Sequence, residues 1–205
     1  MILRILPFTL AASLAIPLTG CVARGARSIT NVIPVPLEEG ANLVPHLSPD
    51  GRQGLVVEAR APDAAAGTRV IMTMLPRAEG VRGWDVVEMD GAGGSRLPTI
   101  DGHGRSVVFA RAKVGGMPAT LVFVASPDPE DGALPSFGAP LPTPRRMVIT
   151  TLRLQADERS ARFQAIDTEI TRGRYCSGTD ALAATYSMDL PEDAPGDTRC
   201  AAPGA

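Results

Sequence analysis

Residues 106–125 read SVVFARAKVGGMPATLVFVA, and this stretch decides the fold class. Two runs rich in valine, phenylalanine and alanine, Ser106–Lys113 and Ala119–Ala125, flank the segment Val114-Gly115-Gly116-Met117-Pro118. Short runs of β-branched and aromatic residues separated by glycines are typical of two strands joined by a tight turn. The stretch therefore predicts an antiparallel β-hairpin.

A second hairpin is predicted where Met147–Gln155 and Ala161–Thr171 flank residues 156–160. In its second strand Phe163 and Ile166 fall on opposite faces, so the alternation does not tell which face is buried. The turn sequence Ser48-Pro49-Asp50-Gly51 precedes three more short apolar runs. These runs are Leu55–Arg60, Arg69–Leu75 and Trp84–Met89. Many short strands with turns between them predict a mostly β, antiparallel, sandwich-like domain, with a barrel as the alternative.

The C-terminal part of the chain predicts one short helix, Asp180–Ser187, capped by Thr179. Leu182 and Tyr186 are spaced four residues apart and so share one face of that helix.

Three cysteines, Cys21, Cys176 and Cys200, set the redox expectations. The segment Leu18-Thr19-Gly20-Cys21 resembles the lipobox of bacterial lipoproteins, and it follows a positive residue, Arg4, and a short apolar run. By that resemblance, residues 1–20 are a signal peptide and Cys21 becomes the lipid-modified first residue. An exported chain then holds two thiols, Cys176 and Cys200, which we expect to form a disulfide that staples the helix.

The resemblance also implies a location. Acyl chains on Cys21 would hold the mature protein on a membrane without a transmembrane helix. Val22 follows the cysteine, at the position where an aspartate would favour retention at the inner membrane. We therefore expect the outer membrane, with the domain facing the periplasm. Residues 21–45 would be the lipidated N-terminus with a tether or arm, in which Ile29–Pro45 is an edge strand or an extended arm, and residues 46–205 would form a single β-rich domain.

Charge and composition exclude some function classes. Removing residues 1–20 takes away Arg4 and no acid, which leaves 19 basic and 22 acidic side chains and a net charge near −3. No basic stripe interleaved with aromatics is present, so nucleic acid is not an expected partner. The segment 126–146 holds six prolines and predicts an exposed loop, with Phe137 and Leu141 as possible anchors.

The search for chemistry yields little. The sequence has no G-x-S-x-G nucleophile elbow, no H-E-x-x-H zinc helix and no phosphate loop, and we assign no catalytic residue, metal ligand or cofactor. The sharpest local cluster is Asp101-Gly102-His103 with Asp90 nearby, and a solvated turn explains it better than a metal site or a hydrolytic pair. Trp84 starts a strand, and we expect it to pack into the core, with ligand stacking as the alternative.

The leading functional hypothesis is a non-catalytic envelope lipoprotein that binds a protein partner or supports an envelope assembly. The alternative is a ligand- or glycan-binding lipoprotein with Trp84, Asp101 and His103 as contacts. A metal-assisted hydrolase around Asp101 and His103 comes third, and whether the chain is an enzyme stays open.

Overall fold

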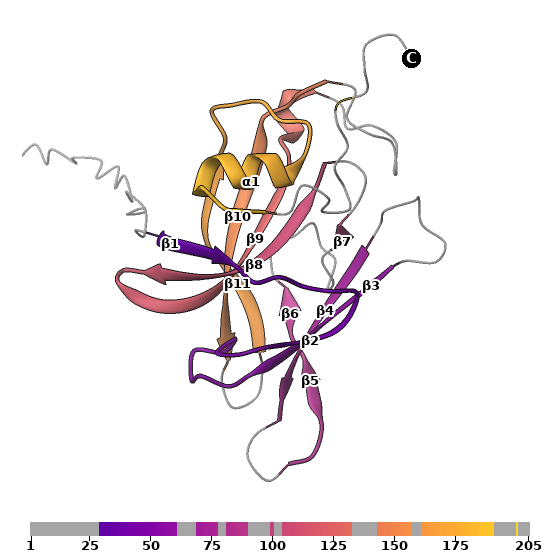
Figure 1. The fold of residues 1–205 in the computed structure, drawn as a ribbon, viewed down its shortest axis with the longest axis vertical. Coiled ribbons are helices and arrows are strands. Elements are labelled where there is room, and N and C mark those ends of the chain that lie inside the picture. The colour runs from indigo at the N-terminus through magenta and orange to yellow at the C-terminus, as the bar shows by residue number, and fades with distance from the viewer. Residues whose placement is uncertain are drawn as a thin grey trace, which may run out of the picture.

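The computed structural model describes residues 29–60, 69–77, 81–89, 99–100, 104–132, 143–156, 161–190 and 200. These residues form two sheets, antiparallel except for one parallel pairing, with one α-helix and one 3-10 helix, Pro129–Asp131 (Figure 1). In sheet A the strands lie in the order β1 (Ile29–Pro34), β8 (Ser106–Val114), β9 (Met117–Pro127), β10 (Met147–Ala156), β11 (Ala161–Ile170) and β6 (Glu88–Met89). In sheet B the strands lie in the order β2 (Gly40–Val44), β3 (Gly54–Arg60), β4 (Arg69–Pro76) and β5 (Trp84–Val86). A short strand, β7 (Thr99–Ile100), also pairs with β4. A mostly β, sandwich-like fold is confirmed.

The hairpin predicted from residues 106–125 is β8 paired with β9. Its turn is formed by Gly115 and Gly116, both with positive φ, 59° and 85°. Two consecutive left-handed residues match the twist of the flanking strands, and glycine adopts this geometry without steric cost. The second predicted hairpin is β10 paired with β11, with a register shift between Thr151 and Leu152. Both faces of β11 pack against apolar residues. Phe163 is fully buried in one core cluster, whereas Ile166 packs against another.

The main core lies between the two sheets. Sheet B and the turn that follows β2 contribute Val44, Leu47, Val56, Ile71 and Leu75. Sheet A contributes Val107, Phe109, Val122, Val124, Leu152, Leu154 and Phe163. The rings of Phe109 and Phe163 meet edge to face, with centroids 6.2 Å apart. Alternating strand residues from both sheets therefore fill one layer, as in a β-sandwich.

The segment Ile29–Pro45 forms edge strands of both sheets, which confirms the edge-strand alternative. β1 pairs with β8 in sheet A, and β2 pairs with β3 in sheet B. The domain boundary predicted at residue 46 was therefore too late, because the β domain already includes Ile29. Pro34 ends β1, where the missing backbone N–H costs the sheet no inner hydrogen bond.

The run Trp84–Met89, predicted as one strand, is divided between the sheets. β5 pairs with β4 in sheet B, whereas β6 pairs in parallel with β11 in sheet A. Between them Val87 is 2% exposed and donates its backbone N–H to the Thr73 carbonyl over 2.8 Å. The buried valine thus marks the point where the chain crosses from one layer to the other.

The one α-helix of the described residues, α1 (Gly178–Tyr186), covers the face of sheet A that is turned away from the core between the sheets (Figure 1). Its cap is Ser177, whose Oγ accepts the Asp180 N–H over 3.1 Å, so the predicted Thr179 cap was wrong. The Thr179 hydroxyl instead lies 2.8 Å from the Ser106 hydroxyl on β8. Gly178 permits this approach, because a Cβ there would stand 2.7 Å from the Gly104 carbonyl oxygen.

Leu182 and Tyr186 pack into the cluster between α1 and sheet A, as their spacing predicted. The cluster also holds Leu121, Phe123 and Ile149 from β9 and β10. The predicted disulfide is present, joining Cys176 just before α1 to Cys200, with Cα atoms 5.0 Å apart. The helix is therefore held by apolar packing and by a covalent staple.

Candidate functional site

Trp84 is the one ligand-contact residue proposed from sequence that the described ranges include. Asp101 and His103 lie outside them, as do Asp90, Cys21 and the lipobox. The loop anchors Phe137 and Leu141 also lie outside.

The expected packing of Trp84 into the core is wrong. Its side chain is 43% exposed, and its backbone pairs with Pro76 at the outer end of β4. β5 is the edge strand of sheet B, and all three of its residues are exposed. The indole therefore lies on the surface, where an aromatic side chain can contact a partner.

Trp84 belongs to a continuous apolar surface, which we call the outer face of sheet B. Strand register and alternation place one set of side chains on the side of this sheet turned away from the core. The set is Ala41 and Leu43 from β2, Leu55, Val57 and Ala59 from β3, Val70, Met72, Met74 and Pro76 from β4, and Trp84 and Val86 from β5. All are apolar and none is charged.

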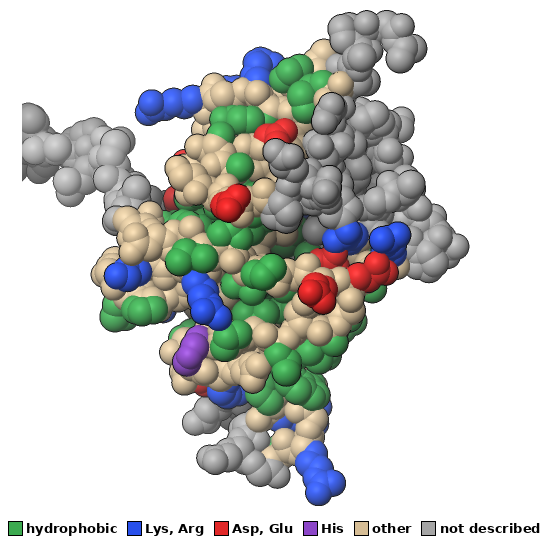
Figure 2. All heavy atoms as spheres, in the orientation of Figure 1, with side chains coloured by type: hydrophobic (Ala, Val, Ile, Leu, Met, Phe, Trp, Pro, Cys, Tyr) green, Lys and Arg blue, Asp and Glu red, His purple; other side chains and the backbone are tan. Residues whose placement is uncertain are grey.

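Side chains of this face remain in contact with solvent. Leu43 is 61% exposed and Val86 52% exposed, while the central residues, such as Val57 and Met74, are half-buried by one another. None of them belongs to a core cluster. Figure 2 shows hydrophobic side chains gathered over the lower part of the molecule, where Figure 1 places the β4–β5 hairpin. An apolar surface of this extent on a monomer is unusual and often marks an interaction site.

The two sheets differ in what covers them. The far side of sheet A is covered by α1, which packs on β8, β9 and β10. Over the outer face of sheet B, no described residue forms a helix or a strand. A sheet normally buries both faces or presents one polar face to water. The outer face of sheet B does neither within the described part of the chain.

Two exposed ion pairs belong to the ends of sheet B. Glu39 and Arg60 form an ion pair of 3.1 Å, and Arg77 and Asp85 form one of 2.9 Å. Arg60 pairs with Arg69 and Asp85 pairs with Leu75, so strand alternation puts both on the face opposite to the apolar set. The outer face of sheet B itself carries no charged strand residue.

The inner side of sheet B carries a buried ion pair. The Arg69 guanidinium donates to Glu58 Oε1, and the two side chains are 16% and 5% exposed. Two charges removed from water in this way stabilise each other only as a pair. The pair holds β3 to β4 beneath the apolar outer face.

The described residues show no group of three or more acidic, histidine or cysteine side chains that could hold a metal ion. None of their helices has both the length and the apolar character needed to cross a membrane. Sequence reasoning missed the outer face of sheet B, because β4 carries apolar side chains on both of its faces. The feature that identifies it is the run Val70-Ile71-Met72-Thr73-Met74-Leu75, which is apolar on both sides of a strand in an antiparallel sheet.

Comparisons with known proteins concern the fold alone. No family model matches the sequence, and no curated protein matches it. The crystal structure of CarG is similar, with a TM-score of 0.55 and 15% sequence identity over 78% of this chain and 96% of that chain. At this identity the likeness shows a shared fold: this chain folds like CarG along nearly all of CarG's length.

Proposed function

We propose that this protein is a lipid-anchored envelope protein whose β domain binds another envelope protein through the outer face of sheet B. The observation that carries the proposal is the uncharged apolar face that extends across β2, β3, β4 and β5. Burial of such a face stabilises a complex by about 25 cal/mol for each Å² of apolar surface removed from water.

The lipobox-like segment supports the envelope location. If Cys21 is acylated, the chain between the anchor and β1 is only residues 22–28. Seven residues extend to at most about 25 Å, so the domain would stay close to the membrane surface. Partners that are held at the same membrane would meet the domain at high effective concentration.

The shape of the face fits an amphipathic helix of the partner. Three spacings of about 4.8 Å between four strands make the face about 14 Å wide. A helix with its side chains is about 10–12 Å across, so one helix covers this width. The same chain shows the arrangement on its other sheet, where α1 covers sheet A with Leu182 and Tyr186.

The test is a cross-linked pull-down of the full-length protein from its native envelope. Leu43→Asp and Val86→Asp place a charge on the outer face at exposed edge positions, where folding tolerates it. Burial of an unpaired carboxylate against apolar atoms costs several kcal/mol, so recovery of the partner should fall more than about tenfold. Met117→Asp is the matched control, because Met117 is 64% exposed and is the first residue of β9 in sheet A, outside this face.

Loss of one partner in both face variants, with full recovery in Met117→Asp, supports the proposal. A Cys21→Ser variant separates the two parts of the proposal, since it should lower recovery by removing the anchor without changing the face. Recovery that is equal in all variants would contradict docking through sheet B. Recovery of a second copy of this chain in place of another protein would replace the partner with self-association.

A further inference from the structure

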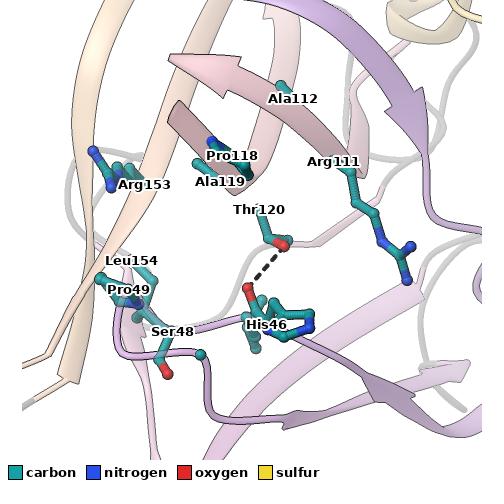
Figure 3. Close-up of a pocket in the computed structure, with 12 residues that line it drawn as sticks. His46, Ser48, Pro49, Arg111, Ala112, Pro118, Ala119, Thr120, Arg153 and Leu154 are labelled. Carbon is teal, nitrogen blue, oxygen red and sulfur yellow. Dashed lines mark hydrogen bonds between the residues drawn. The ribbon is translucent and has the colours of Figure 1, made fainter. Parts of the chain in front are cut away.

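A cavity of about 240 Å³ lies between the β2–β3 connection and sheet A, and none of its lining residues belongs to the outer face of sheet B. One wall is the connection between β2 and β3, from His46 to Gly51. The other wall is the end of sheet A, formed by residues of β8, β9 and β10. Figure 3 shows these residues with the connection below the strands.

The wall made by the connection is held in place by close packing and by a hydrogen bond to sheet A. Leu47 is 2% exposed and fills the space beside Gly54, where a Cβ would stand 2.2 Å from the Leu47 Cδ2 atom. His46 has a positive φ of 54°, and its carbonyl oxygen accepts the Thr120 hydroxyl over 3.0 Å (Figure 3). The cavity is therefore formed before any ligand arrives.

A second set of hydrogen bonds fixes the rest of the connection. The Ser48 hydroxyl donates to Asp50 Oδ1 and also accepts the Arg52 N–H over 2.9 Å. Arg52 binds Asp50 through its Nε over 2.7 Å and the Pro76 carbonyl through its Nη1 over 3.1 Å. The Ser48 hydroxyl and the Arg52 groups together hold the pKa of Asp50 below its ordinary value. The Asp50 carboxylate is therefore already paired with Ser48 and Arg52 inside the turn.

The cavity lining carries positive charge and no carboxylate. Its polar side chains are His46, Ser48, Thr120, Arg111 and Arg153, and the other lining residues are apolar or glycine. Arg111 pairs across the strands with Thr120, so the two side chains share one face of sheet A. Arg153 pairs with Leu121 and so belongs to the other face of sheet A, as the lining residues Ala112 and Ala119 do. Both arginines therefore line the cavity, and Arg111 is the one on the face that carries Thr120.

The Arg111 guanidinium forms no hydrogen bond or ion pair with any residue that the structure describes. Figure 3 shows it extending from β8 on the side where the His46 ring lies. The apolar part of the cavity lining includes Leu47, Pro118, Ala119 and Leu154. A free guanidinium is a planar donor that matches a carboxylate, and apolar walls match a hydrocarbon body.

We propose that this cavity binds a small organic carboxylate, with Arg111 at the carboxylate and Leu47 and Leu154 against its apolar part. The volume is below the roughly 300–1,000 Å³ of pockets that take drug-sized ligands, so the ligand is small. The same chemistry has two sources, a free organic acid and the C-terminal residue of a peptide chain. The proposal is independent of docking through the outer face of sheet B.

The test measures binding of benzoate to the full chain by calorimetry, with benzamide as the uncharged probe of the same shape. Benzoate should bind and benzamide should bind at least about tenfold more weakly, since a hydrogen bond between ions accounts for roughly that ratio or more. Arg111→Gln should weaken benzoate binding by about 10- to 100-fold. Lys113→Gln is the matched control, because Lys113 is an exposed cation two residues along the same face of β8 and does not line the cavity.

A tripeptide, Ala-Ala-Phe, with a free or an amidated C-terminus tests the second source. Binding of the free acid form alone, lost in Arg111→Gln and kept in Lys113→Gln, assigns the site to chain termini. Equal binding of benzoate and benzamide overturns the proposal, as does equal loss in both variants. Absence of any binding of benzoate or tripeptide with a Kd below about 10 mM also overturns it.

Discussion

The Tyr186 hydroxyl donates a hydrogen bond of 2.6 Å to Glu169 Oε1, which joins the last turn of α1 to β11. The Tyr186 ring packs on Phe123 of β9, with ring centroids 4.7 Å apart. One side chain thus contacts two strands of sheet A through its ring and its hydroxyl. The link explains how a helix of only nine residues stays in place on the sheet.

The first prediction concerns alkaline pH. Burial raises the pKa of Tyr186 well above 10, and the hydrogen bond and charge of Glu169 raise it further. Above about pH 10 the unfolded state loses this proton while the folded state keeps it, so the free energy of unfolding falls as pH rises. The fall cannot exceed about 1.4 kcal/mol per pH unit, because Tyr186 accounts for one proton.

Urea unfolding at about pH 9 and about pH 11 tests this dependence. Tyr186→Phe should lower the free energy of unfolding at about pH 9 by about 1 kcal/mol, because Glu169 loses a hydrogen-bond donor. The same variant should lose less stability than the wild type between the two pH values. An identical pH dependence in the two proteins would show that Tyr186 does not titrate as described.

The second prediction concerns the disulfide. Cys176 and Cys200 are 24 residues apart, and on the chain-entropy model closing such a loop stabilises the fold by about 3.5 kcal/mol. The double variant Cys176→Ser and Cys200→Ser should therefore melt roughly 10 °C lower. Calorimetry with and without a thiol reductant measures this. The wild type should lose stability in reductant and the double variant should not; a reductant effect on the double variant would point to another cause.

The third prediction compares two ion pairs of sheet B. Glu58→Ala removes the partner of Arg69 in the buried pair and should cost about 3–5 kcal/mol. Glu39→Ala removes the partner of Arg60 in the exposed pair and should cost under about 1 kcal/mol. Urea midpoints of the two variants measure the difference. Costs of similar size would mean that the Glu58–Arg69 pair is hydrated in solution.

The fourth prediction concerns acid. The pKa of Asp131 is lowered, first by the Arg146 N–H, which it accepts over 2.9 Å, and then by the charges of Arg174 and Arg146. A lowered pKa gives stability that is present above the ordinary value of 3.8 and is lost as pH falls through the folded-state pKa. Asp131→Asn should therefore lose less stability than the wild type between about pH 5 and about pH 2, measured by urea unfolding. Equal losses would contradict the assignment.

The hairpins could be predicted because their signals are local. β-Branched and aromatic residues alternate along 106–125, and Gly115-Gly116 supplies the only geometry that joins two such strands closely. The cysteine pairing followed from the number of thiols, since Cys176 and Cys200 are the two that remain if Cys21 is acylated. The helix was also predicted, although its cap was placed at Thr179 in place of Ser177, because both hydroxyls stand before the first apolar residue.

The position of Trp84 could not be predicted from its residue type. The strand next to it, β4, is apolar on both faces, so alternation gives no direction for the core. Only the crossing at Val87, which moves the chain into sheet A, leaves Trp84 at an edge. The cavity at Arg111 could not be predicted either. Its lining combines the turn at His46 with strands more than sixty residues away in the chain.

The bond between Cys176 and Cys200 closes a ring that contains the whole of α1. A protease that cuts one peptide bond inside the ring opens it without releasing a fragment, since the two new ends stay joined through sulfur. The cut chain would keep its mass on a non-reducing gel and separate into two pieces only after reduction. Where proteases are present, the ring would let the domain survive one cut with its helix still attached to sheet A.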